Sequence, residues 1–372
     1  MKTFKQLGVK DNFIKALSDM KIDKPSEIQE KAIPFLLEEG TDFIGQAQTG
    51  TGKTAAFGLP LLQRIDSNDS SVQGLILSPT RELCQQIQKQ LFKYTKFTQG
   101  IFSVAVYGGE KIEQQIRMLS RPTQIVVATP GRLIDLLEKK AIDLSQVETI
   151  VLDEADEMLS MGFKDELESI LKHTVGSRNT WLFSATLPEN LREIVSKYMA
   201  DDAFKVEINK RNVVNSSIEH QFVTCDPRFK FQTLVQFIQI HGKDSGIIFC
   251  KTKAGTQKLV DQLLSKNYSV AAIHGDMQQR DREKTMRAFK GHKIQLMVTT
   301  DVSARGIDID DLNFVVHYDL PEKMEYYTHR SGRTARAGKK GMSLSIIENN
   351  EVRKIRKLEQ SLNIKFTRIT AK

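Results

Sequence analysis

The stretch Ala47-Gln48-Thr49-Gly50-Thr51-Gly52-Lys53-Thr54 decides the fold class. It follows the short apolar run 42–45 and precedes a helical pattern, so it joins a strand to a helix. Its two central glycines allow backbone amides to curl around phosphate oxygens. Lys53 can reach the β- and γ-phosphates, and the Thr54 hydroxyl can hold Mg²⁺. The usual phosphate-loop pattern has Gly where Ala47 stands, but the Gly-Lys-Thr end is intact, and the stretch predicts a nucleoside triphosphate site.

Apolar runs rich in β-branched residues alternate with amphipathic helical patterns on both sides of this loop. Such alternation favours parallel sheets covered on both faces, and hence an α/β fold. The predicted strands are residues 42–45, 74–78, 103–107, 124–128, 149–153 and 180–184, then 246–250, 270–274, 296–300, 314–318 and 342–347. We expect a duplicated architecture of two α/β domains, residues 1–208 and 218–372, joined by a polar linker at 209–217.

Composition excludes several classes of protein. The chain has 372 residues, of which 40% are hydrophobic and 27% charged, as in globular proteins with a full core. No run approaches 18 uncharged apolar residues, so we expect no membrane span. The only cysteines, Cys84, Cys225 and Cys250, are widely spaced, which disfavours a disulfide framework or a zinc cluster. A cytoplasmic location is therefore expected.

Charge is unevenly distributed along the chain. Residues 1–208 carry 25 basic and 29 acidic side chains, whereas residues 209–372 carry 29 basic and 17 acidic ones. An asymmetry of this size suggests that the second half faces a polyanion, with nucleic acid as the first candidate. A basic surface that serves only solubility is the alternative.

A second motif, Val151-Leu152-Asp153-Glu154-Ala155-Asp156, places carboxylates at the end of a buried-looking strand. Ligands bind at that end of the strands in parallel α/β sheets. Asp153 is suited to hold Mg²⁺, and Glu154 is suited to polarise the attacking water. An acidic helix start is the simpler alternative for this motif alone. The phosphate loop about 100 residues upstream favours the catalytic interpretation.

Together these two motifs resemble the DEAD-box RNA helicase family, and the other motifs of that family follow in order. The resemblance covers Phe4 to about Ile347. The further matching motifs are Pro25–Gln29, Pro79–Leu83, Gly108-Gly109, Thr129–Arg132, Ser184-Ala185-Thr186, Phe249–Thr252, Gln279 with Arg282, Thr300-Asp301, Ala304–Asp308 and His329–Arg336. The resemblance implies two tandem RecA-like domains with a cleft between them.

It also implies a set of nucleotide-binding residues for ATP and Mg²⁺. Gln29 would read the adenine edge, and Asp308 would approach the ribose. Arg333 and Arg336, expected on one helix, would act as arginine fingers, while His329 would link that motif to the acidic motif. The nucleotide-binding set is Phe4, Lys24, Gln29, Ala47, Gln48, Thr49, Gly50, Thr51, Gly52, Lys53, Thr54 and Asp308; Thr54 and Asp153 would hold the metal.

The RNA-binding and coupling residues are likewise implied by the resemblance. Arginine charge, threonine hydroxyls and a glycine amide suit phosphate and 2′-hydroxyl contacts without base readout. Some, such as Thr129, could instead cap helices. The predicted RNA contacts are Arg81, Gly109, Thr129, Arg132, Lys251, Thr252, Gln279, Arg282 and Thr300; Ser184 and Thr186 would couple hydrolysis to domain movement.

The expected function is RNA-stimulated ATP hydrolysis that closes two domains and separates short RNA duplexes locally. An ATP-gated RNA clamp for protein partners uses the same residues and stays open as an alternative. A DNA translocase is a third hypothesis. Ribonucleoprotein or RNA-decay partners, a monomeric core and a bacterial source are further expectations from the resemblance.

Overall fold

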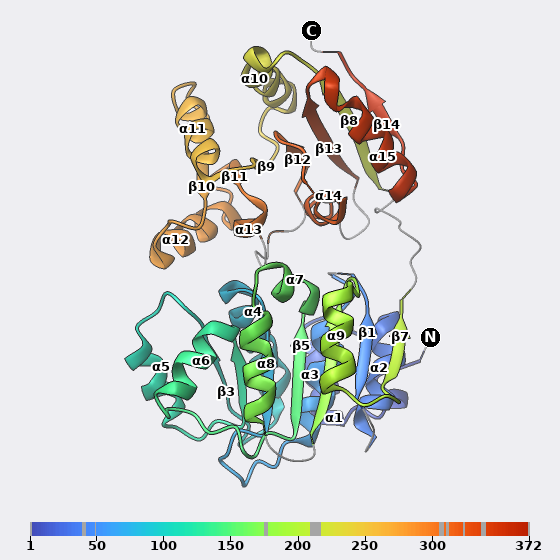
Figure 1. Cartoon of the computed structure of the whole chain (residues 1–372), viewed down its shortest axis with the longest axis vertical. Coiled ribbons are helices and arrows are strands. Elements are labelled where there is room, and N and C mark those ends of the chain that lie inside the picture. The colour runs from blue at the N-terminus through green and yellow to red at the C-terminus, as the bar shows by residue number, and fades with distance from the viewer. Residues whose placement is uncertain are drawn as a thin grey trace. The chain divides into compact units, whose positions relative to one another are not determined.

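A computed structural model of the chain describes residues 2–38, 42–48, 50–174, 178–208, 217–304, 309, 312–322, 324–335 and 340–370 (Figure 1). The chain forms two compact units, Met1–Asn209 and Lys210–Lys372, which are described separately below. Of the predicted linker at 209–217, only Ser217 belongs to the described residues.

The first unit contains a seven-stranded sheet in which every pair of neighbouring strands is parallel. The strand order is β3-β4-β2-β5-β6-β1-β7. The strands are β1 (Phe43–Gln46), β2 (Gly74–Leu77), β3 (Ser103–Val106), β4 (Ile125–Ala128), β5 (Thr149–Asp153), β6 (Asn179–Ser184) and β7 (Phe204–Glu207).

Helices cover both faces of this sheet because its strands alternate apolar side chains between two cores. Trp181 and Phe183 face one core and Leu182 faces the other. The first core holds α1 (Asp11–Asp19), α2 (Glu27–Leu37), α3 (Lys53–Arg64) and α4 (Arg81–Tyr94); the second holds α5 (Ile112–Leu119), α6 (Pro130–Glu138), α7 (Ala155–Ser160), α8 (Lys164–His173) and α9 (Glu189–Tyr198).

The second unit repeats this plan. Its sheet is also parallel throughout, with the order β10-β11-β9-β12-β13-β8-β14. The strands are β8 (Ile218–Thr224), β9 (Gly246–Phe249), β10 (Val270–Ile273), β11 (Leu296–Thr299), β12 (Phe314–His317), β13 (Gly341–Ile347) and β14 (Phe366–Arg368); the helices are α10 (Lys230–His241), α11 (Lys253–Leu264), α12 (Gln279–Lys290), α13 (Asp301–Ala304), α14 (Met324–Ser331) and α15 (Val352–Leu362).

The two strand orders are the same permutation, since replacing β1 by β8, β2 by β9 and so on converts one into the other. The α/β prediction and the predicted duplication are therefore confirmed. All eleven predicted strands are present within one residue of their expected bounds. The structure adds β7 and β8, which flank the linker, and β14, a three-residue edge strand whose sequence Phe366-Thr367-Arg368 is too short and polar to be predicted.

Candidate active site and nucleic-acid interface

All predicted site motifs of the first unit lie at one edge of its sheet. The phosphate loop follows β1, the acidic motif ends β5 and Ser184 ends β6. The predicted RNA contacts follow β2, β3 and β4. Because β3-β4-β2 and β5-β6-β1 form opposite halves of the sheet, RNA candidates and nucleotide candidates occupy neighbouring but separate parts of the edge.

Lys53 and Asp153 form the buried centre of the nucleotide half. Lys53 is the first residue of α3 and only 6% exposed, yet its Nζ has no hydrogen-bond partner among the described residues. Burial raises the pKa of Asp153 to about 7, while the Lys53 ammonium opposes that rise. A buried ammonium without a partner is costly unless an anion joins it. The pair thus fits a triphosphate with its metal ion.

Glu154 is held in a left-handed backbone conformation between β5 and α7, with φ 52° and ψ 49°. Such a conformation is uncommon for a residue with a side chain and costs about 1 to 2 kcal/mol. The Glu154 amide donates to Asp153 Oδ1 at 3.1 Å. The turn therefore fixes the backbone between two consecutive carboxylates at the carboxyl end of β5.

Gln29 connects α2 to the phosphate loop. Its Oε1 accepts from the Ser26 amide at 2.9 Å, and its Nε2 donates to the Gly52 carbonyl at 3.0 Å. Gly52 has φ 93°, and a Cβ there would overlap Gln29 Nε2. Gln29 thus holds the start of α3, a role separate from the predicted adenine contact. Only glycine at residue 52 leaves room for this hydrogen bond.

Ser184 and Thr186 surround the last carboxylate of the acidic motif. Asp156 Oδ2 accepts from the Thr186 amide at 2.9 Å and from Thr186 Oγ1 at 2.8 Å. The Asp156 amide donates to Ser184 Oγ at 3.2 Å. Sequence reasoning did not assign a role to Asp156, although its place in the same motif as Asp153 was a signal.

The remaining predicted nucleotide residues differ in placement. Phe4 is 3% exposed in the first core, and Ala47 is also buried. Lys24, Gln48 and Gly50 are exposed, whereas Thr51 and Thr54 are half-buried. Thr49, Asp308 and Arg336 lie outside the described residues.

The second unit places His329 on α14 and Arg333 just beyond it. Helix α14 ends at Ser331, so the expectation that Arg333 lies on a helix is wrong. Thr334 instead pairs with Leu312 in an isolated bridge and hydrogen-bonds its carbonyl, which draws the chain out of helical geometry. Arg333 is half-buried in the intervening turn.

A buried polar network anchors α14 to the sheet. Arg330 makes a bidentate ion pair with Asp301 at 2.5 and 2.7 Å. His317 Nε2 lies 3.3 Å from Ser331 Oγ and 3.1 Å from Ser343 Oγ, and its ring stacks on Tyr327. Burial lowers the pKa of His317 well below its usual value. The helix that carries His329 is thus fixed by neutral histidine and paired charges.

The RNA half of the first unit brings Arg81 and Gly109 together. Gly109 has φ 87°, and a Cβ there would overlap the Arg81 guanidinium. Thr129 occupies the N-cap position of α6 without a side-chain cap hydrogen bond. Arg132 bonds to Asp135, Gln115 and the Glu110 carbonyl, so its guanidinium holds the loop after β3 in place.

The equivalent half of the second unit carries the other RNA candidates. Thr252 caps α11, since its hydroxyl accepts from the Gly255 amide at 3.0 Å. Helix capping, the alternative role considered for Thr129, is therefore seen at Thr252 and not at Thr129. Arg282 donates to the Ser303 carbonyl at 2.7 Å, and Thr300 Oγ1 lies 3.1 Å from Ser303 Oγ. Gln279 is buried at the start of α12, and Lys251 is exposed. These residues follow β9, β10 and β11, the counterparts of β2, β3 and β4.

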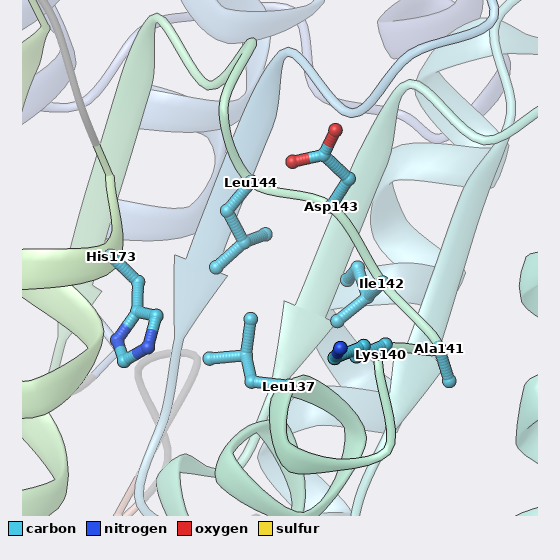
Figure 2. A pocket seen from close by; sticks show the side chains of 7 residues that line it. All are labelled: Leu137, Lys140, Ala141, Ile142, Asp143, Leu144 and His173. Carbon is cyan, nitrogen blue, oxygen red and sulfur yellow. The ribbon is translucent and has the colours of Figure 1, made fainter.

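A pocket of about 460 Å³ lies away from these motifs, lined by Leu137, Lys140, Ala141, Ile142, Asp143, Leu144 and His173 (Figure 2). Asp143 accepts from the amide and the hydroxyl of Ser145, and His173 Nδ1 lies 2.8 Å from the Ser169 carbonyl. Asp143 and His173 thus have hydrogen-bond partners next to them in sequence, and the pocket contains none of the predicted site residues.

The fold and the first-unit site define a nucleoside triphosphatase with a phosphate loop and two tandem α/β units. Residues 26–194 match the DEAD/DEAH box helicase family, and residues 229–338 match the helicase conserved C-terminal domain. The ATP-dependent RNA helicase CshA of Listeria monocytogenes is 42% identical over 97% of this chain and 69% of the relative. CshA of Geobacillus kaustophilus is 38% identical over 99% of this chain and 78% of the relative.

Solved structures show the same likeness. S. cerevisiae Dbp5 bound to RNA and ADP BeF3 has a TM-score of 0.90 at 33% identity, over 100% of this chain and 96% of that chain. Mss116p bound to ssRNA and AMP-PNP has a TM-score of 0.87 at 30% identity, over 99% of this chain and 80% of that chain. The chain belongs to the DEAD-box family of ATP-dependent RNA helicases, and its two units are RecA-like.

No described helix is long and apolar enough to cross a membrane. No group of three or more His, Cys, Asp or Glu side chains among the described residues could hold a metal ion.

Proposed function

We propose that this chain hydrolyses ATP with the residues at the carboxyl edge of β1, β5 and β6. Lys53 binds the β- and γ-phosphates, and Thr54 with Asp153 would hold Mg²⁺, which supplies charge neutralisation when bound. Glu154 orients the attacking water. The buried Lys53 ammonium, which has no hydrogen-bond partner among the described residues, is the observation that carries this proposal.

The RNA contacts extend the proposal to both units. Arg81, Gly109, Thr129 and Arg132 would bind single-stranded RNA on the first unit, with Arg132 also supporting the loop. Lys251, Thr252, Gln279, Arg282 and Thr300 would bind it on the second. Support comes from the matching positions of the two sets on equivalent strands and from the RNA-bound relatives. Contacts to phosphate and 2′-hydroxyl groups favour RNA of any sequence.

Hydrolysis and RNA binding are coupled through domain closure in this mechanism. ATP and RNA each favour a closed state, in which Arg333, Arg336 and His329 complete the first-unit site and Asp308 approaches the ribose. Asp156, Ser184 and Thr186 transmit the change within the first unit. Closure separates short duplexes locally. Ribonucleoprotein partners, a monomeric core and a cytoplasmic location belong to the same proposal.

The deciding experiment is steady-state ATP hydrolysis with Mg²⁺, measured without nucleic acid, with single-stranded RNA and with DNA of the same sequence. Stimulation by RNA alone supports the proposal, and equal rates in all three conditions contradict it. A duplex-separation assay then distinguishes a helicase from an ATP-gated RNA clamp, which would bind RNA without separating strands.

A further inference from the structure

Residues 209–372 carry a net charge of +12, and residues 352–368 supply +5 of it. Residues 352–368 contain six basic side chains and one acidic side chain, Glu359. They form α15 and β14, which lie beyond residue 338, where the match to the helicase C-terminal domain ends. The predicted RNA contacts of this unit lie between residues 251 and 300, so they leave this charge unexplained.

The geometry of α15 directs its charge outward. Ile355, Leu358 and Leu362 are buried in the core formed with β8 and Tyr327. At 100° per residue, Arg353, Arg356 and Lys357 fall on the opposite arc of the helix, and Lys354 lies at its border beside the buried stripe. All four side chains are exposed. We call these four residues the α15 basic face. Lys365 and Arg368 add exposed positive charge on and next to β14.

Few carboxylates neutralise this surface. Lys354 pairs with Glu351 at 2.9 Å, and Arg368 donates to the neutral Thr224 hydroxyl at 2.9 Å. Among the described residues, Arg353, Arg356 and Lys357 have no carboxylate within 4.0 Å. Unpaired like charges on one helix face repel one another, so an anionic partner would stabilise the arrangement.

The α15 basic face is separate from the predicted RNA contacts of the same unit. Those contacts follow β9, β10 and β11, which form one half of the sheet. Helix α15 packs on β8, which pairs with β14 at the opposite edge (Figure 1). Strands β12 and β13 lie between the two regions.

We propose that the α15 basic face binds the phosphate backbone of RNA outside the strand held by the predicted motif contacts. This inference rests on the proposed function, which brings RNA to the protein. A membrane surface fits poorly, because the apolar side of α15 is buried and has nothing to insert. Phosphate contacts by lysine and arginine need no base sequence, so the site would hold any RNA that extends beyond the core.

The test compares three variants of the full chain with wild type. The first replaces the α15 basic face by Arg353→Gln, Lys354→Gln, Arg356→Gln and Lys357→Gln, since glutamine is a good helix former. The matched control removes the same charge from exposed lysines of the first unit: Lys89→Gln, Lys93→Gln, Lys172→Gln and Lys205→Gln. The third, Arg353→Lys with Arg356→Lys, keeps the charge.

Each form is titrated against a short single strand and against a duplex with a long single-stranded extension, over a range of salt concentrations. We expect the glutamine variant to bind the long RNA about tenfold more weakly or worse, with a salt slope smaller by up to about 2.8 for single-stranded or about 3.6 for duplex contacts. Binding of the short strand, and the ATPase activity that it stimulates, should stay unchanged. The control and the lysine variant should behave as wild type.

If the glutamine variant and wild type bind the duplex with the long extension with equal affinities and salt slopes, the proposal is overturned. An acidic protein surface would then be the remaining candidate partner of the α15 basic face. An equal loss on the short strand, or the same loss in the matched control, would overturn it too. Failure of the short strand to stimulate the wild-type ATPase would instead contradict the proposed function, which keeps the two failures distinct.

Discussion

Asp156 and Thr186 are joined by two hydrogen bonds to a single carboxylate oxygen, at 2.9 Å from the Thr186 amide and 2.8 Å from its hydroxyl. Asp156 lies in α7, which follows β5, and Thr186 lies two residues beyond the end of the adjacent strand β6. Ser184 Oγ completes the connection by donating to the Thr186 carbonyl at 2.7 Å. These hydrogen bonds tie the segment after β6 to the acidic motif.

Thr186→Val should uncouple hydrolysis from strand separation. The change keeps the shape and the backbone hydrogen bond but removes the hydroxyl bond to a charged group, worth about 1.5 to 3 kcal/mol. We expect RNA-stimulated ATPase activity within a few-fold of wild type and a loss of duplex separation of about tenfold. Both rates are measured on one preparation. Thr186→Ser keeps the hydroxyl and should restore separation; a Val variant that unwinds normally would refute the coupling role.

Glu154→Gln should stop turnover while leaving ATP binding intact. The substitution keeps the size of the side chain but removes the carboxylate that orients water, an effect typically of about 10²- to 10⁴-fold on kcat. ATP-dependent retention of RNA should persist, and it is measured by filter binding alongside the hydrolysis assay. Glu148→Gln, at an exposed position, serves as the control. Normal hydrolysis by Glu154→Gln would exclude the residue from catalysis.

Gly52→Ala should weaken ATP binding through Gln29. A Cβ at residue 52 would overlap Gln29 Nε2, and φ 93° is strained for alanine. We expect the Kd for ATP to rise about tenfold, and Gln29→Ala to have a similar effect. Both changes break the same contact. The double variant should therefore lose less ATP-binding free energy than the sum of the two single losses. Strict additivity in this cycle would show that the contact is unimportant.

Gly131→Ala is the matched control, since nothing lies within 4 Å of a Cβ at that position. Its ATP affinity should equal that of wild type in the same titration.

Acid should destabilise the second unit through its buried histidines. Burial lowers the pKa of His220 to about 4 and holds the pKa of His317 well below its usual value. Below pH 6.5 the unfolded chain binds protons that the folded unit does not, so unfolding free energy falls as pH falls, by up to about 1.4 kcal/mol per pH unit and histidine. Thermal unfolding between pH 7.5 and 5 measures this. His317→Asn should flatten the dependence, and an unchanged slope would refute the assignment.

The sequence was sufficient for the fold because buried parallel strands are continuous apolar runs, and the motifs mark their carboxyl ends. Gly52 and Lys53 are an example: because they follow an apolar run by a few residues, the sequence predicted that they lie at the carboxyl edge of the sheet. The hydrogen-bond partners of the site side chains were harder to predict, because those partners are distant in sequence. The Gln29–Gly52 bond spans 23 residues and the Asp156–Thr186 bond spans 30. Helix α14 ends before Arg333 because Thr334 pairs with Leu312. The periodicity of apolar residues does not predict such a pairing.

Trp181, the single tryptophan of the chain, is 1% exposed in the first core, next to Arg64. Its indole emission therefore reports unfolding of one unit only, since the other contains no such fluorophore. Comparing that signal with far-ultraviolet circular dichroism, which sums over every helix, would separate the two melting transitions without labelling or truncating the protein.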